Sequence, residues 1–482
     1  MKYFTVTSYY LVAAIASGGL NILLLPVYTR FLSPSDFGII ALFGTFGIIT
    51  TGLVSIGIHK ATYKFYFDLE NKQEELVTMV STNLIYLIFI FFLTGTIIYF
   101  NSNWFSVNLF ANQINNKLIN LSFFGGCLTY LINYKTLLLT AQTRAKEFTL
   151  VTIFRAIINN ILSFYFIFAH SLTYMSRIYA SIITQIIIVF TLLFLNRNLL
   201  GFKFSFFKLK RSLIFSYPNA PRSIIGLIYK SFDKILLNKF TGLDSVGYYA
   251  IGSQLASIIK VLINSFSKSF SPFFFSLANK KGSAQKNLIV KRFYEVAFII
   301  MFFGLCTITF SEELIKLLTT EKFDAAMYVI PIYVFYHLFS VIGFISVPQI
   351  MFAEKMIYLL PHTIVSIIIN IVLNIALIPS YGAVGAALAT AISQLCTSIV
   401  IYYLAQKAYY LPLSLSKTLK LYLILLILSV LVFPIMISDL PVLTKLLLKI
   451  GIISSYVLYG YKNIFTKNEL MVVFQNFKLK KS

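Results

Sequence analysis

The chain has 482 residues, of which 58% are hydrophobic and only 12% are charged. Soluble domains carry about 25% charged residues, so this composition excludes a string of soluble domains and indicates a protein that lies largely within a membrane. The net charge is +24, from 40 basic and 16 acidic residues. Basic residues that remain on the cytoplasmic side explain such a surplus in a membrane protein, so the charge does not call for a nucleic-acid partner.

A membrane crossing needs about 20 predominantly apolar residues, and the sequence contains fourteen such stretches joined by short connectors. We therefore expect an all-α, polytopic membrane protein with about 14 transmembrane helices. The expected helices lie at approximately residues 8–28, 37–58, 79–100, 118–140, 148–169, 178–195, 213–237, 246–270, 293–311, 327–350, 357–378, 384–405, 419–438 and 442–461.

The basic residues are distributed unevenly between alternate connectors. If the N-terminus is cytoplasmic, the segments on that side hold 25 basic residues and the loops on the other side hold 6. The six outer residues are Arg30, Lys117, Arg177, Lys239, Lys316 and Lys322. This ratio predicts that both termini are cytoplasmic, because basic residues are retained on that side of the membrane.

Two pairs of segments match at one offset of 209 residues. FLSPSDFGIIA at 31–41 aligns without gaps with FTGLDSVGYYA at 240–250, and ASIITQ at 180–185 aligns with ATAISQ at 389–394. The repeat unit holds six helices, an even number, so both copies enter the membrane in the same sense. The pattern predicts two parallel six-helix bundles related by an axis along the membrane normal, with a substrate site between them.

The repeat and the basic segments also suggest the limits of the domains. We expect an N-terminal six-helix bundle at 1–196, a basic cytoplasmic linker at 197–212 and a C-terminal six-helix bundle at 213–406. The remaining segment, 407–482, would add two transmembrane helices and a basic cytoplasmic tail.

Nine basic residues fall inside the predicted spans, where a lipid-facing charge costs at least ~2.5–3.5 kcal/mol. They are Lys135, Arg155, Arg222, Lys230, Lys234, Lys260, Lys268, Lys445 and Lys449. Lys234 and Lys268 lie near span ends and can extend their charge to the interface, and we expect the same of Lys445 and Lys449. Arg222 and Lys260 lie closest to the middle of their spans, followed by Lys230 and Arg155.

Polar residues form stripes beside these deep cations. On 246–270, serines and an asparagine share one face with Lys260, and on 148–169 Thr152, Arg155 and Asn159 line up with Ser163. For serine and asparagine alone, hydrogen bonds that hold helices together are the favoured explanation. The cations outnumber the buried acids, however, and this favours an anionic ligand such as a phosphate or pyrophosphate.

Asp233 is the only deep carboxylate within the predicted spans. One interpretation makes it a local salt-bridge partner of Lys230 or Lys234, which lie within one helical turn. The other makes it a site for a coupling proton or sodium ion. The sequence leaves both interpretations open.

The sequence offers little support for enzyme chemistry. It contains no zinc-protease motif, P-loop, nucleophile elbow or metal-ligand cluster, and its three cysteines lie far apart in apolar stretches. We therefore expect no catalytic residue, no cofactor and no metal. A membrane glycosyltransferase or polymerase remains a lesser alternative, with His337, Glu312 and Glu313 as its candidate groups, although the outer connectors are short.

The segment LLLPVYTRFLSPSDFGIIALF, residues 23–43, resembles the N-terminal signature of bacterial polysaccharide-export flippases. These are the Wzx type of the multidrug/oligosaccharidyl-lipid/polysaccharide superfamily. The matching positions are Pro26, Tyr28, Thr29, Arg30, Leu32, Pro34, Asp36, Phe37 and Gly38. Residues 216–255 also resemble that family, in a proline-bearing helix start, an Asp-Lys pair near the helix end and a G-x-x-x-V-G-Y-Y turn.

The resemblance implies a MATE-like V of two bundles that opens alternately to each side of the bacterial cytoplasmic (inner) membrane. It implies transport of a lipid-linked oligosaccharide, carried on undecaprenyl pyrophosphate, for O-antigen, capsule or exopolysaccharide synthesis. The candidate partners are membrane lipid, a polysaccharide polymerase and a chain-length regulator, with no nucleic acid.

The charge argument, and not a family motif, selects the expected pyrophosphate ligands, Arg155, Arg222, Lys230 and Lys260. A multidrug or small-solute exporter of the same superfamily is the main alternative function. Such an exporter would need carboxylates in its cavity, because drug substrates are often cationic. The excess of buried bases argues against it.

Overall fold

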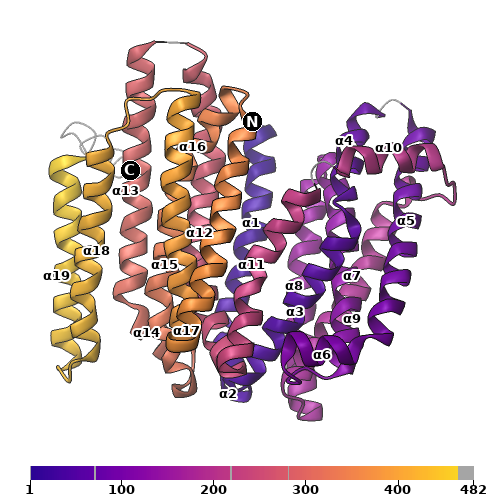
Figure 1. Ribbon diagram of the computed structural model, residues 1–482, viewed down its shortest axis with the longest axis horizontal. Coiled ribbons are helices and arrows are strands. Elements are labelled where there is room, and N and C mark those ends of the chain that lie inside the picture. Colours follow the sequence, from indigo (N-terminus) through magenta and orange to yellow (C-terminus); the bar gives the residue numbers. More distant parts are fainter. Residues whose placement is uncertain (1, 70–71, 218–219, 281, 465–482) are drawn as a thin grey trace, which may run out of the picture. The chain divides into compact units, whose positions relative to one another are not determined.

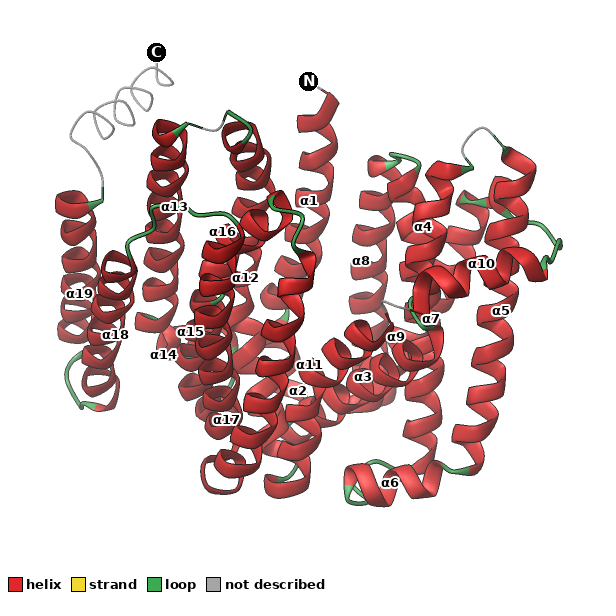
Figure 2. Ribbon diagram, turned by 45° about the horizontal axis from the view of Figure 1, so that its top comes forward, coloured by secondary structure: helices red, strands yellow, loops and turns green. Residues whose placement is uncertain are grey.

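A computed structural model describes residues 2–69, 72–217, 220–280 and 282–464. Within α1 and α11, the side chains of residues 2–8, 11, 14, 221–225 and 228–230 are not described. All regular elements in the described ranges are helices (Figure 1, Figure 2). The first twelve are α1 (Lys2–Leu23), α2 (Leu25–Phe31), α3 (Pro34–Ser55), α4 (Ile58–Asp68), α5 (Gln73–Phe100), α6 (Ser102–Phe110), α7 (Asn116–Ala141), α8 (Ala145–His170), α9 (Tyr174–Leu195), η1 (Arg197–Leu199), α10 (Phe206–Ser216) and α11 (Ala220–Thr241).

The remaining helices run from Leu243 to Asn463. They are α12 (Leu243–Ala278), α13 (Ser283–Thr309), α14 (Ser311–Leu318), η3 (Glu321–Tyr328), α15 (Val329–Phe339), α16 (Val341–Phe352), η4 (Met356–Tyr358), α17 (Leu359–Ala408), α18 (Leu415–Ile437) and α19 (Val442–Asn463). The all-α membrane architecture expected from the composition is confirmed.

Length and apolar character separate the helices that can cross a membrane from the others. In the described ranges nine helical segments meet both conditions, or ten if the bent pair α13 and α14 forms one span. The expected spans 8–28, 118–140 and 213–237 correspond to α1, α7 and α11, which lie outside this set. α17 joins two expected spans into 50 residues, with a break at Gly382, whose φ is 53°. The total of fourteen spans stays a prediction.

The chain divides into two compact units. Unit 1 contains Met1–Ala250, Leu318–Lys322 and Asn374–Ala386, and unit 2 contains Ile251–Leu317, Phe323–Leu373 and Ala387–Ser482. This grouping follows compactness within the fold, and the domain limits expected from the repeat stay a prediction.

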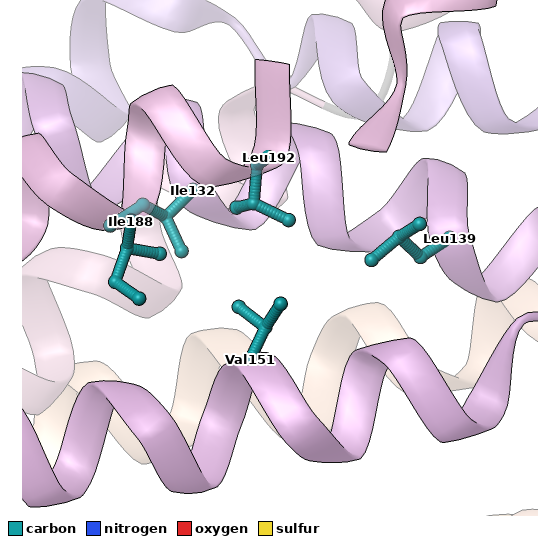
Figure 3. Close-up of a cluster of buried hydrophobic side chains, with 5 residues drawn as sticks. All are labelled: Ile132, Leu139, Val151, Ile188 and Leu192. Atoms are coloured by element: carbon teal, nitrogen blue, oxygen red, sulfur yellow. The ribbon is translucent and has the colours of Figure 1, made fainter. Parts of the chain in front are cut away.

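Apolar side chains between α7, α8 and α9 form a core cluster in unit 1 (Figure 3). It consists of Ile132, Leu139, Val151, Ile188 and Leu192, all less than 9% exposed. The same three helices pack against α1 and α3. This packing fixes the helices that surround the cavity described below.

Much of the flippase-like signature builds the start of α3. Pro34 is the first residue of the helix, where its missing N–H is not needed. Ser33 caps the helix: its Oγ accepts a hydrogen bond from the Asp36 N–H at 3.2 Å, and the Asp36 carboxylate accepts one from the Ser33 N–H at 2.8 Å. The signature therefore marks a structural turn.

The two copies of the matching segment meet at one crossing of α3 and α12. A Cβ atom on Gly38 would lie 2.2 Å from the Leu243 carbonyl oxygen, and a Cβ on Gly247 would lie 2.0 Å from that of Pro34. Pro34 and Leu243, like Gly38 and Gly247, are related by the offset of 209 residues, so the two contacts mirror each other. Glycine at both places permits this backbone contact, which supports the repeat assigned from sequence.

The predicted linker is attached to unit 1 by hydrogen bonds and ion pairs. The Gly201 N–H donates to Ser81 Oγ at 2.9 Å, and the Ser205 N–H donates to Thr82 Oγ1 at 3.0 Å. Lys208 Nζ lies 3.4 Å from a carboxylate oxygen of Glu75. α10 consequently packs against α4 and α5 across one end of the unit (Figure 1).

An ion-pair cluster in unit 2 attaches α19 to α14. Lys449 is fully buried, and its Nζ lies 2.5 Å from Glu313 Oε1 and 3.5 Å from Glu312 Oε2. Phe298 of α13 stacks on Tyr456 of α19 with ring centroids 4.6 Å apart. The two C-terminal helices are therefore part of the packed unit, and Lys449 finds acidic partners instead of extending to the interface.

Candidate functional site: a cationic cavity in unit 1

A cavity of about 500 Å³ lies inside unit 1, between α1, α3, α7, α8 and α9. Its polar lining consists of Ser17, Asn21, Ser122, Thr129, Thr152, Arg155, Asn159, Asn160, Arg177, Ser181 and Gln185. None of the described residues that line it is acidic. The cavity is therefore positive and rich in hydrogen-bonding groups.

Glycines bring α3 and α7 together at one wall of the cavity. A Cβ atom on Gly47 would lie 2.5 Å from the Ser122 carbonyl oxygen, and one on Gly126 would lie 2.4 Å from that of Gly47. The two backbones therefore touch at this crossing, and Gly47, Gly125 and Gly126 expose backbone to the cavity. No larger residue fits at the crossing unless the helices move apart.

Arg155 enters the cavity from the middle of α8. Thr152 and Asn159 lie about one turn away on the same face and also line the cavity. The stripe expected from sequence on 148–169 therefore faces the cavity at three of its four positions. Spacing along the helix was sufficient to group these side chains.

Arg177, at the start of α9, is the second cation of the cavity. The carbon of its guanidinium lies 4.2 Å from the ring centroid of Tyr28. Tyr28 is fully buried, and its hydroxyl donates a hydrogen bond to Asn160 Oδ1 at 2.7 Å. A guanidinium over an aromatic face can still donate its N–H groups to a ligand, so Tyr28 positions Arg177 without neutralising it.

Sequence reasoning missed Arg177 by assigning it to an outer loop. The signal for the cavity was nevertheless present, because Arg177, Ser181 and Gln185 recur at intervals of four residues. Gln185 is 6% exposed, and its Nε2 donates to Ser181 Oγ at 3.0 Å. Its Oε1 has no hydrogen-bond partner in the described part of the chain.

The structure describes the side chains of two of the four expected pyrophosphate ligands, Arg155 and Lys260. Arg155 lines the cavity of unit 1, whereas Lys260 is exposed on α12 in the part that belongs to unit 2. Arg222 and Lys230 lie on α11, and their side chains are outside the described residues. Their joint role stays a prediction.

Asp233 is held by hydrogen bonds. The residue is 5% exposed, and its carboxylate accepts hydrogen bonds from the Tyr249 hydroxyl and, at 2.8 Å, from the backbone N–H of Lys234. These contacts link α11 to α12, and the expected roles of Asp233 as a salt-bridge partner or a coupling-ion site stay predictions. Lys135 is a different case: it is 2% exposed, and its Nζ has no hydrogen-bond partner among the described residues.

The fold and the cationic cavity define a polytopic membrane protein with the architecture of transporters. The structure resembles the lipid II flippase MurJ in an inward closed conformation, with a TM-score of 0.71 and 16% identity over 95% of this chain and 99% of that one. It also resembles an inward-facing multidrug resistance transporter of the MATE family, with a TM-score of 0.65 and 12% identity over 82% and 93% of the two chains. The expected MATE-like fold is confirmed.

Residues 27–328 match the family described as "Polysaccharide biosynthesis protein", and the chain belongs to this family. It is 25% identical over 191 residues to the "Probable low-salt glycan biosynthesis flippase Agl15" of Haloferax volcanii, over 39% of this chain and 40% of the relative. It is 24% identical over 206 residues to the "Capsular polysaccharide biosynthesis protein CapF" of Staphylococcus aureus, over 42% and 51%. The chain therefore covers about half or less of these relatives, and the resemblance found from sequence is confirmed at the level of the family.

Proposed function

We propose that the protein moves a lipid-linked oligosaccharide repeat unit, carried on undecaprenyl pyrophosphate, across the bacterial cytoplasmic membrane by alternating access. The product would supply O-antigen, capsule or exopolysaccharide synthesis, with a polysaccharide polymerase and a chain-length regulator as partners. The observation that carries this proposal is the cavity of unit 1, which offers two arginines and several amides without a lining carboxylate. Membership of the polysaccharide biosynthesis family supports it.

In this proposal the cations contact the anionic headgroup. Arg155 acts from the cavity, and Arg222, Lys230 and Lys260 act from the helices that follow the linker. The prenyl tail stays in the lipid while the headgroup crosses, and both termini remain cytoplasmic. An arginine binds a phosphate oxygen pair through two parallel hydrogen bonds, and a lysine acts as a point charge.

Two other functions fit the observations less well. A multidrug exporter for cationic substrates would need acidic groups, and the described residues that line the cavity include none. A glycosyltransferase or polymerase would need catalytic acids, but Glu312 and Glu313 are ion-paired with lysines. We therefore propose a transporter that performs no catalysis.

Complementation tests the function in cells. In a strain that lacks the gene, the wild-type chain should restore surface polysaccharide and remove the lipid-linked repeat units that accumulate on the cytoplasmic side. Arg155→Ala and Lys260→Ala should restore less surface polysaccharide than the wild-type chain. Lys260→Arg keeps the charge and should restore more of it than Lys260→Ala. Lys146→Ala is the matched control, because Lys146 is exposed near the start of the same helix as Arg155. Full export by both alanine variants at normal expression would contradict the proposal.

A further inference from the structure

The cations of the cavity are absent from the second copy of the repeat. At the offset of 209 residues, Arg177 corresponds to Ala386 and Arg155 corresponds to Ile364. α17, which contains the counterpart of the matching segment on α9, has no arginine, and its only lysine is Lys407 in the last turn. The helices of the second copy therefore form without arginines at the corresponding positions, so packing of the repeat does not require them.

One acceptor in the cavity lacks a donor. Gln185 Oε1 is buried without a hydrogen-bond partner in the described part of the chain, while its Nε2 donates to Ser181. An unsatisfied buried acceptor is costly unless a donor reaches it. A fully ionised phosphate or carboxylate has only hydrogen-bond acceptors. It can bind the arginines, but it cannot donate a hydrogen bond to Gln185 Oε1. The lining therefore matches a ligand that carries an anionic group and a hydroxyl donor together.

The cavity is larger than a single small ion requires. Ligand pockets are typically about 300–1,000 Å³, and this cavity of about 500 Å³ falls within that range. Asn21 and Asn159 add amide donors and acceptors to its walls. Amides and hydroxyls suit the alternating donors and acceptors of a sugar ring.

We propose that this cavity binds an acidic sugar of the repeat unit, whose carboxylate pairs with Arg155 and Arg177 and whose hydroxyl donates to Gln185. The inference rests on the proposed function and specifies its substrate class. It moves Arg155 from the diphosphate of the carrier to the sugar, and it leaves the diphosphate to Arg222, Lys230 and Lys260. The sugar phosphate at the reducing end of the headgroup has a similar chemistry, so the test must separate the two sources.

Two probes make that separation. Both are disaccharides on undecaprenyl diphosphate, and they differ only in one sugar, which is glucuronic acid in the first and glucose in the second. Binding of each probe to the full-length protein in lipid nanodiscs is measured by calorimetric titration. The wild-type protein should bind the acidic probe at least about tenfold more tightly, since one well-formed charge-assisted contact contributes about 1.5–3 kcal/mol.

The variants then identify the residues responsible. Arg155→Gln and Arg177→Gln should each abolish the preference for the acidic probe, because they weaken the binding of that probe alone. Arg177→Lys should retain part of the preference, and Lys146→Ala should retain all of it. Lys260→Ala should lower the affinity for both probes by the same factor. Unchanged thermal unfolding of each variant shows that the bundle is intact.

Equal affinities of the wild-type protein for the two probes would overturn the inference and leave the proposed function standing. Equal weakening of both probes by the Arg155 and Arg177 substitutions would also overturn it, because the arginines would then hold the diphosphate. If neither probe binds the wild-type protein, the proposed function itself fails.

Discussion

Replacing Gly38 with alanine tests the crossing of α3 and α12 directly. The new Cβ would lie 2.2 Å from the Leu243 carbonyl oxygen, and real Cβ contacts almost never fall below 3.0 Å, so the two backbones must separate by about 1 Å. Overpacking of this kind costs about 1–3 kcal/mol, and a rigid backbone partner places it at the upper end. We expect Gly38→Ala to lower the apparent unfolding temperature of the purified protein by several degrees.

Gly247→Ala should have a similar effect, because its Cβ would meet the Pro34 carbonyl oxygen at 2.0 Å. The double variant should lose less stability than the sum of the two single losses, since the separation caused by one methyl group relieves the other. Gly44→Ala, on the same helix as Gly38 but with no atom within 4 Å of the added Cβ, is the control and should be neutral or slightly stabilising. A Gly38→Ala variant as stable as the wild-type protein would refute this account of the crossing.

Three further predictions concern other contacts. Lys449→Met should cost about 1–3 kcal/mol in stability, measured by thermal unfolding, because it removes the buried partner of Glu312 and Glu313 while Lys316 still pairs with Glu312. Burial and the neighbouring lysine lower the pKa of His59 to about 4. Since the unfolded chain binds a proton below about pH 6.5, stability should fall as the pH drops from about 6.5 to about 4, and His59→Gln should reduce that fall. Glu75→Lys should repel Lys208 and increase hydrogen exchange in α10, measured by mass spectrometry.

Each of these predictions has a control and a contrary result. Lys316→Ala removes an exposed partner of Glu312 and should cost much less than Lys449→Met, so equal losses would contradict the role of the buried pair. A pH profile that His59→Gln leaves unchanged would show that this imidazole does not carry the effect. Exchange in α10 that is identical in Glu75→Lys and the wild-type protein would show that the ion pair does not hold the linker.

Features that depend on spacing along one helix could be predicted from sequence. The stripe of Thr152, Arg155 and Asn159 faces the cavity because residues three and four apart share one side of a helix. The close packing at Gly38 and Gly247 is reflected in the sequence repeat, because both copies have glycine at that position. The family signature was equally legible, since it is continuous in sequence.

Features that depend on tertiary contacts could not be predicted in this way. Arg177 lies next to a connector, and the rule for charge topology assigned it to the outer surface. Its contact with the ring of Tyr28 depends on the packing of α2 against the bundle. Lys449 finds Glu312 across 137 residues of sequence. Asp233 accepts a hydrogen bond from Tyr249, a residue type that a search for charged partners passes over. Sequence spacing does not encode these pairings.

Transport by purified protein tests the central claim most directly. Vesicles that contain the full-length chain as their sole protein would receive a fluorescent disaccharide that contains glucuronic acid, carried on undecaprenyl diphosphate, and a membrane-impermeant quencher would report how much of it reaches the outer leaflet. We expect movement well above that of protein-free vesicles, abolished in the double variant Arg155→Ala/Arg177→Ala and retained in Lys146→Ala. Wild-type vesicles that move the lipid no faster than protein-free ones, or a double variant as fast as the wild-type protein, would contradict the account.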